Sequence, residues 1–413
     1  SLLKIKEARK SKESKPISIR SSLSNKLISS LEFDLTSALS RCINQINEDL
    51  STSEPMLRLL QGDVGSGKTI VAVFALIQVA ENNFQTAVMA PTEILARQHL
   101  QNFTNYLSPL GIQIAFLSGS QNTQERKDNL SLIENGKAKV IIGTHALFQE
   151  NVYFDDLALV IIDEQHKFGV HQRLSLSKKA NVTPHQLVMT ATPIPRSLTM
   201  SAYADLDTSI IDELPPGRQT IETVALSNAR RDELIEKIKQ ISKEGRQIYW
   251  VCTLIEESEA LRAESAEQTF TYLSDNLKDL KVVMIHGRLT KLEKEIIMSD
   301  FASGKTNLLV ATTVIEVGVN IPNASLMIVE NSERLGLAQL HQLRGRVGRG
   351  SEKSACVLLY QSPLSQTAKE RLDILRQSND GFLIAQKDLE LRGPGEILGT
   401  QQTGIASMKI ANI

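Results

Sequence analysis

The sequence is poor in cysteine and contains no long apolar run, and each shortage excludes a class of protein. Its three cysteines, Cys42, Cys252 and Cys356, are far apart and lack the spacing of metal ligands, which argues against a disulfide framework or a zinc site. No apolar run approaches the roughly 20 residues that span a bilayer, and no secretory signal pattern opens the chain. We therefore expect a protein of the reducing cytoplasm, with no membrane partner.

Aromatic residues make up only 4% of the 413 residues and do not cluster, so no platform for stacking bases is expected. The formal net charge of −1 does not mark a nucleic-acid-binding protein. Residues 1–26 are strongly basic, because they contain eight Lys or Arg residues and only two acidic residues, Glu7 and Glu13. This basic arm either contacts phosphate groups or is a solvated tail. Since the chain begins with Ser1 rather than Met, we expect it to be part of a longer protein.

The stretch LLQGDVGSGKTI (59–70) satisfies the pattern G-x-x-x-x-G-K-[ST] of a phosphate-binding loop. An apolar run precedes it and an apolar helical run follows, a context that distinguishes it from a chance glycine-rich turn. Backbone N–H groups and the dipole of the following helix would hold the phosphates. Lys68 would reach the β- and γ-phosphates, and Thr69 would hold Mg²⁺. The predicted nucleotide-binding residues are Gly62, Asp63, Val64, Gly65, Ser66, Gly67, Lys68 and Thr69.

Short β-branched apolar runs alternate with longer helical stretches from about residue 33 onward. After the phosphate loop they occupy residues 86–92, 139–144, 157–164 and 186–192, and beyond a Pro- and Gly-containing break at 212–220 they occupy 247–253, 281–287, 307–313, 325–331 and 355–360. Strands that are apolar on both faces belong to parallel sheets covered by helices, and ligands collect at the carboxyl ends of such strands. We predict an α/β protein with two parallel-sheet domains in tandem.

The expected divisions of the chain are a basic helical lead-in with few core positions (1–32), a first domain that binds ATP (33–214), a second domain (215–365) and a C-terminal segment (366–413). By its pattern alone, the last segment holds one helical stretch followed by a glycine-rich end, as an appendage rather than a third core.

An acidic pair, Asp163-Glu164, ends the apolar run LALVIID. Such a pair is often only a solvated strand end, but beside a phosphate loop it suits magnesium-assisted hydrolysis. Asp163 would hold Mg²⁺ and its waters, and Glu164 would orient and deprotonate the attacking water. We therefore predict that both carboxylates face the bound triphosphate.

Further motifs in a fixed order resemble those of superfamily 2 helicases. They are GDVGSGKT (62–69), APTEILARQ (90–98), GTHAL (143–147), DEQH (163–166), TATPIPRSL (190–198), ATTVIEVGVNIPNA (311–324) and QLRGRVGRG (342–350). Longer stretches, including DEQHKFGVHQR, MTATPIPRSLTM and DLELRGPGEILGTQQTG, resemble the RecG family of bacterial branched-DNA helicases. The transcription-repair coupling factor is similar in the same regions, but that family usually lacks the Gln165-His166 pair.

The resemblance implies two RecA-like domains, followed by a helical hairpin and a returning loop that couple domain closure to movement along duplex DNA. The implied cofactors are ATP and Mg²⁺. Arg346 and Arg349 would be arginine fingers supplied by the second domain, with Gln342 beside them and Asn320 at the ribose. The implied DNA-backbone contacts are Thr92, Arg97, Thr144, His145, His286, Arg288 and Thr312, and the implied coupling residues are Gln165, His166, Arg371, Arg392 and Gln402. His145 and His286 are otherwise ordinary histidines at strand ends, and Gly393, Pro394 and Gly395 otherwise serve only to turn the chain.

Two positions depart from the family pattern. Leu39 stands where the adenine-reading element has glutamine, and leucine cannot form the paired amide hydrogen bonds to adenine. Asn320 stands where aspartate is frequent, and it still reaches a ribose without charge. Preference for ATP over other triphosphates is therefore less secure than in the family.

These inferences lead us to expect an ATP-dependent, magnesium-requiring motor that moves on double-stranded DNA. Within a RecG protein it would remodel stalled forks and recombination intermediates, binding branched DNA through the backbone without sequence preference. We expect a monomer in the bacterial cytoplasm, associated with the nucleoid and without the wedge domain that reads the junction. The alternatives are the motor of a coupling translocase and a DNA-binding remnant without enzymatic activity.

Overall fold

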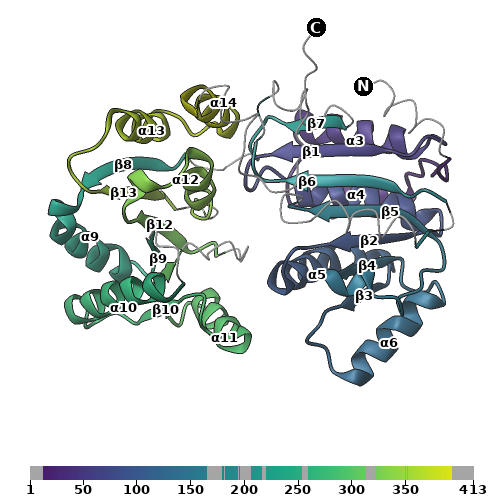
Figure 1. Cartoon of the computed structure of the whole chain (residues 1–413). Helices are drawn as coiled ribbons and strands as arrows, with labels where there is room; N and C mark the ends of the chain where they lie inside the picture. The colour runs from purple at the N-terminus through teal and green to yellow at the C-terminus, as the bar shows by residue number, and fades with distance from the viewer. Residues whose placement is uncertain are drawn as a thin grey trace, which may run out of the picture.

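The computed structural model describes residues 13–164, 179–180, 182–193, 195, 206–215, 220–253, 259–312, 321–348, 350 and 352–392. These residues form two β-sheets, each packed with helices (Figure 1). The strand orders are β3-β4-β2-β5-β6-β1-β7 in the first sheet and β10-β11-β9-β12-β13-β8 in the second. All strand pairs are parallel. The predicted α/β class with two tandem parallel-sheet domains is confirmed.

The first sheet packs against α4, the helix that follows the phosphate loop. Its strands are β1 (Leu57–Gly62), β2 (Gln85–Met89), β3 (Ile114–Leu117), β4 (Val140–Gly143), β5 (Leu157–Asp163), β6 (His185–Thr190) and β7 (Asp207–Ile211). Its helices are α2 (Ser22–Ser30), α3 (Ser37–Leu50), α4 (Lys68–Glu81), α5 (Glu93–Leu107) and α6 (Thr123–Glu134), with short 3₁₀ turns η1 (Ser108–Leu110) and η2 (His145–Phe148). Ten consecutive residues of α4 are buried, from Ile70 to Val79, because α2, α3 and α5 pack against it as well as the sheet.

The second sheet begins after the Pro-containing break. Its strands are β8 (Glu222–Ser227), β9 (Gln247–Cys252), β10 (Val282–Ile285), β11 (Leu308–Thr312), β12 (Ala324–Val329) and β13 (Ala355–Tyr360). Its helices are α9 (Arg231–Lys243), α10 (Glu259–Asn276), α11 (Lys291–Ala302) and α12 (Leu337–Arg344), with 3₁₀ turns η4 (Asn228–Arg230) and η5 (Ser332–Arg334). No helix in the parts of the chain described here combines the length and the apolar character that crossing a membrane requires.

Every apolar run identified in the sequence is a strand, but three further strands were not predicted. They are β3, β7 and β8, and all three lie at an edge of their sheet. An edge strand has a neighbour on one side only, and its outer parts need not be apolar on both faces. β7 reads DTSII and β8 reads ETVALS, and both are only partly buried. Neither therefore carries the continuous apolar pattern of a central strand.

The lead-in contributes more to the first domain than its polar composition indicates. Ile17 and Leu27 are fully buried in the core of the first sheet. Lys15 pairs with Asp156, with Nζ 2.6 Å from Oδ2, and its backbone oxygen lies 2.9 Å from Nε2 of His185. The described part of the lead-in is therefore attached to the sheet, with Ile17 and Leu27 as its buried core positions.

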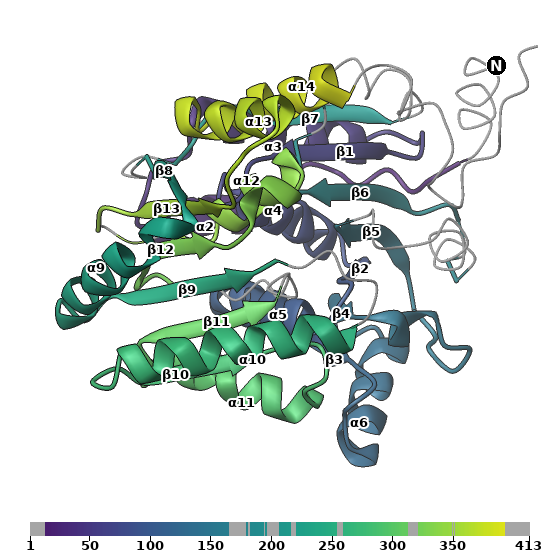
Figure 2. The same cartoon turned by 60° about the vertical axis from the view of Figure 1, so that its left-hand side comes forward.

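The tail contains two helices rather than the single stretch that the pattern indicated. They are α13 (Gln366–Gln377) and α14 (Gly381–Arg392), and Figures 1 and 2 show the hairpin beside α12. Asp380 Oδ1 accepts hydrogen bonds from the N–H groups of Phe382 and Leu383 (2.8 and 3.3 Å), so a side-chain cap starts the second helix. The three residues Leu372, Leu375 and Ile384 belong to the core of the second sheet. The glycine-rich end, residues 393–413, lies outside the described residues.

Replacing Ile17 with alanine tests whether the lead-in is part of the first domain. Because Ile17 is fully buried, Ile17→Ala is expected to lower the free energy of unfolding by about 2–5 kcal/mol. The matched control is Ile19→Ala, since the Ile19 side chain is 57% exposed and its loss is expected to change stability by less than about 0.5 kcal/mol. Urea unfolding followed by circular dichroism measures both, and equal effects would show that the lead-in is not part of the fold.

Candidate active site at the junction of the two domains

The phosphate loop joins β1 to α4 through a turn that requires glycine. Gly67 has φ +101° and lies at the N-terminus of α4, where an L side chain would be strained. At Gly62, a Cβ atom would collide with Ser66 Oγ and lie 3.1 Å from Ile211 Cβ, so a side chain there would displace the Ser66 hydroxyl. The loop therefore presents backbone N–H groups and the positive end of a 14-residue helix to one small volume, which is the arrangement that binds phosphate.

Lys68 and Thr69 are the first two residues of α4. The Lys68 ammonium donates to the backbone oxygens of Gly62 (2.7 Å) and Asp63 (2.8 Å). These bonds hold the charge over the loop. Thr69 is half-buried on the same first turn of the helix, where its hydroxyl is one hard oxygen ligand of the kind that Mg²⁺ prefers.

Asp163 ends β5, and β6 lies between β5 and the strand that enters the phosphate loop. Its Oδ2 lies 2.8 Å from Nε2 of His99, on α5. Burial raises the pKa of the Asp163 carboxyl, but the hydrogen bond and charge of His99, together with the charge of Lys68, lower it more, so the net pKa lies below its usual value. The carboxylate is thus kept ionised, as a metal ligand must be.

Glu164 has φ +52°, a left-handed conformation that is uncommon for a residue with a side chain. Its backbone N–H donates to Met189 O (3.0 Å), and its Oε1 accepts from the N–H of Ala191 (3.3 Å). The carboxylate is therefore positioned beside the end of β6. Strain of this kind is frequent at functional sites.

His99 was not predicted as a site residue, although its spacing from Thr92 in the sequence could have indicated it. It lies seven residues after Thr92, which is two helical turns and the same face of α5. His99 is 8% exposed, and its ring stacks on Phe103 with centroids 5.3 Å apart. The stacking and the bond to Asp163 fix the direction in which that carboxylate points.

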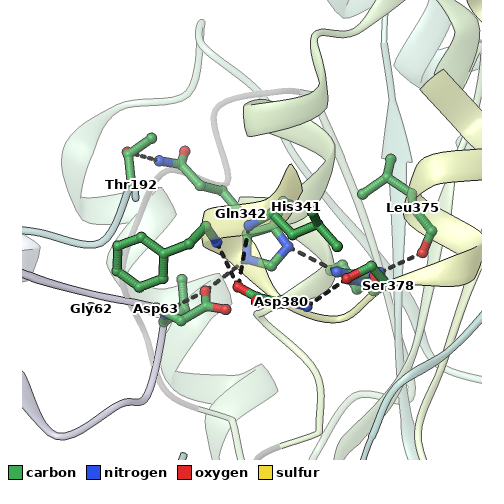
Figure 3. A network of polar contacts seen from close by, with 12 residues as sticks. Gly62, Asp63, Thr192, His341, Gln342, Leu375, Ser378 and Asp380 are labelled. Atoms are coloured by element: carbon green, nitrogen blue, oxygen red, sulfur yellow. Dashed lines mark hydrogen bonds and ion pairs between the residues drawn. The ribbon is translucent and has the colours of Figure 1, made fainter. Parts of the chain in front are cut away.

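The second domain reaches the phosphate loop through α12 and the turn after it. His341 Nε2 lies 2.7 Å from Asp63 Oδ1 (Figure 3), and a Cβ atom added at Gly345 would lie only 3.0 Å from Val64 Cβ. Arg346 follows Gly345 directly, which brings its backbone beside the loop. The predicted finger Arg349 lies outside the described residues, as does Asn320.

Gln342, which was predicted at the catalytic centre, contacts the first domain. Its Nε2 donates to Thr192 Oγ1 at 2.6 Å (Figure 3). Thr192 follows β6, so this bond joins α12 to the strand end that also holds Glu164. Neither Thr192 nor His341 was singled out from the sequence.

Three family models match the chain in the order of its domains. They are the DEAD/DEAH box helicase (residues 39–201), the helicase conserved C-terminal domain (230–351), and the C-terminal part of domain 3 of ATP-dependent DNA helicase RecG (378–413). The ATP-dependent DNA helicases RecG of Escherichia coli (strain K12) and Haemophilus influenzae are 56% and 54% identical to the chain, over 100% and 96% of it. The chain belongs to the RecG family.

A solved structure of RecG bound to a three-way DNA junction is also similar, with a TM-score of 0.83 and 43% identity over 99% of this chain and 53% of that one. The chain spans 60% and 58% of the length of the two RecG relatives named above. A DUF1998 helicase, MrfA, shares the fold, with a TM-score of 0.66 at 16% identity.

The RecG-like positions for DNA contact lie at the carboxyl ends of neighbouring strands. Thr92 and Thr144 follow β2 and β4, and His145 comes next in η2; His286 and Arg288 follow β10, and Thr312 ends β11. In Figures 1 and 2 these strands occupy the same side of both domains. Arg97 pairs with Glu93 (2.9 Å) and lies over the Phe116 ring, so part of its charge is already neutralised.

The RecG-like coupling residues are only partly described. Arg371 lies on α13, and its Nε is buried without a hydrogen-bond partner in the described parts of the chain. Arg392 is the last residue of α14. The side chain of Arg392 and all of Gln165, His166 and Gln402 lie outside the described residues.

Leu39, the departure from the adenine-reading pattern, is 2% exposed. It packs on the phosphate loop, since a Cβ atom at Gly67 would lie 2.9 Å from Leu39 Cδ2. Leu39 thus supports the loop through an apolar contact, whereas a glutamine at this position would offer amide hydrogen bonds.

Replacing His99 with alanine tests its action on the metal ligand. Removing the bond to Asp163 leaves the carboxylate less firmly oriented, so His99→Ala is expected to weaken Mg²⁺ binding with the nucleotide by about 10-fold or more. Binding of a fluorescent ATP analogue titrated with Mg²⁺ measures this effect without turnover. His145→Ala is the matched control, since His145 is a surface histidine of the same domain away from β5. An unchanged Mg²⁺ midpoint in His99→Ala would show that His99 does not position Asp163.

Proposed function

We propose that this chain is the motor of a RecG-type DNA helicase, which hydrolyses ATP with Mg²⁺ and uses the resulting domain movements to drive double-stranded DNA. The observation that carries the proposal is the contact of the second domain with the phosphate loop, through His341 and Asp63 at 2.7 Å and through Gly345 and Val64. A nucleotide in this loop would be enclosed by both domains, so its hydrolysis depends on their closure.

In the proposed reaction, Lys68 and the loop N–H groups bind the phosphates, and the second domain supplies Arg346 and Arg349 to the charge that develops in the transition state. Thr69 and Asp163 would hold Mg²⁺, since one hydroxyl and one ionised carboxylate match the few protein ligands that Mg²⁺ takes beside phosphates. The bound metal would neutralise charge on the β- and γ-phosphates. Glu164 would orient the attacking water and accept its proton.

The proposed DNA contact runs along the carboxyl ends of β2, β4, β10 and β11. Two buried polar atoms there, His286 Nδ1 and Thr312 Oγ1, have no hydrogen-bond partner among the described residues, and such atoms call for a partner. Because both atoms are buried, a phosphate oxygen would reach them only after the neighbouring side chains move. The scarcity of aromatic residues and the hydroxyl and basic side chains favour contact with the backbone rather than with bases.

The similar solved structure has RecG bound to a three-way DNA junction, and on this basis we propose forked and branched DNA as the substrate. Remodelling of stalled forks and branch migration of recombination intermediates would follow. We also propose the division into an ATP-binding domain (33–214), a finger-bearing domain (215–365) and a coupling tail (366–413), acting as a monomer in the bacterial cytoplasm, in association with nucleoid DNA.

Phosphate release in Mg²⁺ and ATP, with and without forked DNA at low salt, tests the proposal directly. Strong stimulation by DNA is expected. Hydrolysis without stimulation would assign DNA coupling to regions beyond this chain, and no hydrolysis despite ATP binding would contradict the proposed motor.

Glu164→Gln tests the assignment of the base. The amide keeps the shape of the side chain but cannot accept the proton, so ATP should bind normally while hydrolysis falls by about 10²–10⁴-fold. Nucleotide titration and single-turnover phosphate release separate the two steps. Glu150→Gln, an exposed residue of the same domain, is the control. Near-normal turnover in Glu164→Gln would remove Glu164 from the reaction.

Arg288→Ala tests the DNA-contacting edge. Because Arg288 is exposed just beyond β10, its loss should weaken binding equally for unrelated duplex sequences and reduce the slope of log affinity against log salt by about 1. Lys278→Ala is the control, since Lys278 is exposed before β10, at the opposite end of the strand. Fluorescence anisotropy at several salt concentrations gives both slopes. A sequence-dependent loss, or equal losses in the two variants, would contradict the proposed edge.

A further inference from the structure

A buried arginine stands between the active site and the tail hairpin. Arg344, the last residue of α12, is 2% exposed. Its Nη1 donates to the backbone oxygens of Leu375 (2.7 Å) and Ser378 (2.8 Å), at the end of α13 and the turn after it. It also donates to Thr223 Oγ1 on β8 (3.2 Å). A buried guanidinium is costly unless its N–H groups are bonded, so these bonds hold the hairpin turn in one position relative to α12.

The same guanidinium orients His341. Arg344 Nη2 lies 2.8 Å from His341 Nδ1, and because arginine only donates, Nδ1 is the acceptor. The ring proton is then on Nε2, which donates to Asp63 Oδ1 at 2.7 Å. The geometry thus gives a directed chain of hydrogen bonds from Arg344 through His341 to Asp63 of the phosphate loop; Figure 3 labels His341 and Asp63.

Asp63 connects this chain to the groups that face the phosphates. Its Oδ1 also accepts from the N–H of Val64 (2.8 Å), and its backbone oxygen accepts from Lys68 Nζ (2.8 Å). A nucleotide that recruits Lys68 and the loop N–H groups would therefore change the position of Asp63. His341, whose ring is 5% exposed, would have to follow.

The hairpin also touches the loop directly through Gly381, the first residue of α14. A Cβ atom there would lie 2.7 Å from His341 Nε2, 2.8 Å from Pro193 Cγ and 3.0 Å from Asp63 Oδ2. The absence of a side chain lets the start of α14 fit between the two domains. A movement of the loop would therefore reach the hairpin at two points, Arg344 and Gly381.

We propose that His341 is a positioning residue that transmits the nucleotide state of the phosphate loop to the tail hairpin, through Asp63 on one side and Arg344 on the other. This inference rests on the proposed function, since it assigns the bound group as a Mg²⁺–nucleoside triphosphate. It makes the hairpin a direct sensor of the loop rather than a passive attachment to the second domain.

Hydrogen exchange of the hairpin amides tests this link in the full chain. A non-hydrolysable ATP analogue with Mg²⁺ should change exchange across 366–392 by about threefold or more in the parent protein. In His341→Leu, which removes both ring hydrogen bonds, that response should be lost while the analogue still binds, as a fluorescent-nucleotide titration would verify.

Gly381→Ala is a second variant that removes no polar group and only adds a methyl to the crowded junction, so it should also abolish the response. Gly119→Ala is its matched control, because a Cβ atom at Gly119 has no neighbour within 4 Å, and it should respond like the parent. Fork unwinding per ATP hydrolysed should fall with the response in both junction variants, since hydrolysis would no longer move the hairpin.

Different results overturn different claims. A parent protein that binds no nucleotide would overturn the proposed function together with the link. A parent that binds and hydrolyses ATP without any change in the hairpin would overturn the link alone. A full hairpin response in both His341→Leu and Gly381→Ala would likewise show that the chain of hydrogen bonds does not carry it.

Discussion

The hydrogen bond between His341 and Asp63 joins two domains whose cores are otherwise built around separate sheets. It forms because small residues stand where the elements meet. Gly345 lies against Val64, and Gly381 fits among His341, Pro193 and Asp63. A side chain at Gly381 would force its neighbours to shift, and one at Gly345 would press on Val64. In the proposed motor the nucleotide would be shared between the phosphate loop of one domain and the cationic turn of the other, and hydrolysis would then depend on how the domains are arranged.

Parallel sheets explain why functional groups gather at one edge. All strands of a sheet end at the same side, so residues after β1, β5 and β6 lie together at the phosphate loop, while those after β2 and β4 lie farther along the same edge. Helix α5 spans both regions. It begins next to Thr92, at a position expected to contact DNA, and carries His99, which bonds to Asp163. The helix therefore joins a predicted DNA-contact position to the predicted metal ligand.

The local pattern predicted the central strands well, because a strand buried on both faces must be apolar throughout. It failed at the edge strands β7 and β8, which are free of that requirement, and it also missed β3, although IAFL is apolar throughout. It also failed to divide the tail, where the cap at Asp380 ends one helical pattern and begins another. The phosphate loop was predictable residue by residue, because its function depends on consecutive backbone groups and on a glycine at a left-handed position.

The sequence by itself determined the fold class, the phosphate loop, the acidic pair and the order of the helicase motifs, since each is written in a continuous stretch of residues. Only the tertiary structure decided that His99 orients Asp163, that Gln342 bonds to Thr192, and that His341 links Asp63 to a buried Arg344. In the sequence, His99 and Asp163 are 64 positions apart, Gln342 and Thr192 are 150 apart, and His341 and Asp63 are 278 apart. No periodicity or spacing encodes such pairs, because they depend on how two sheets and a hairpin pack together.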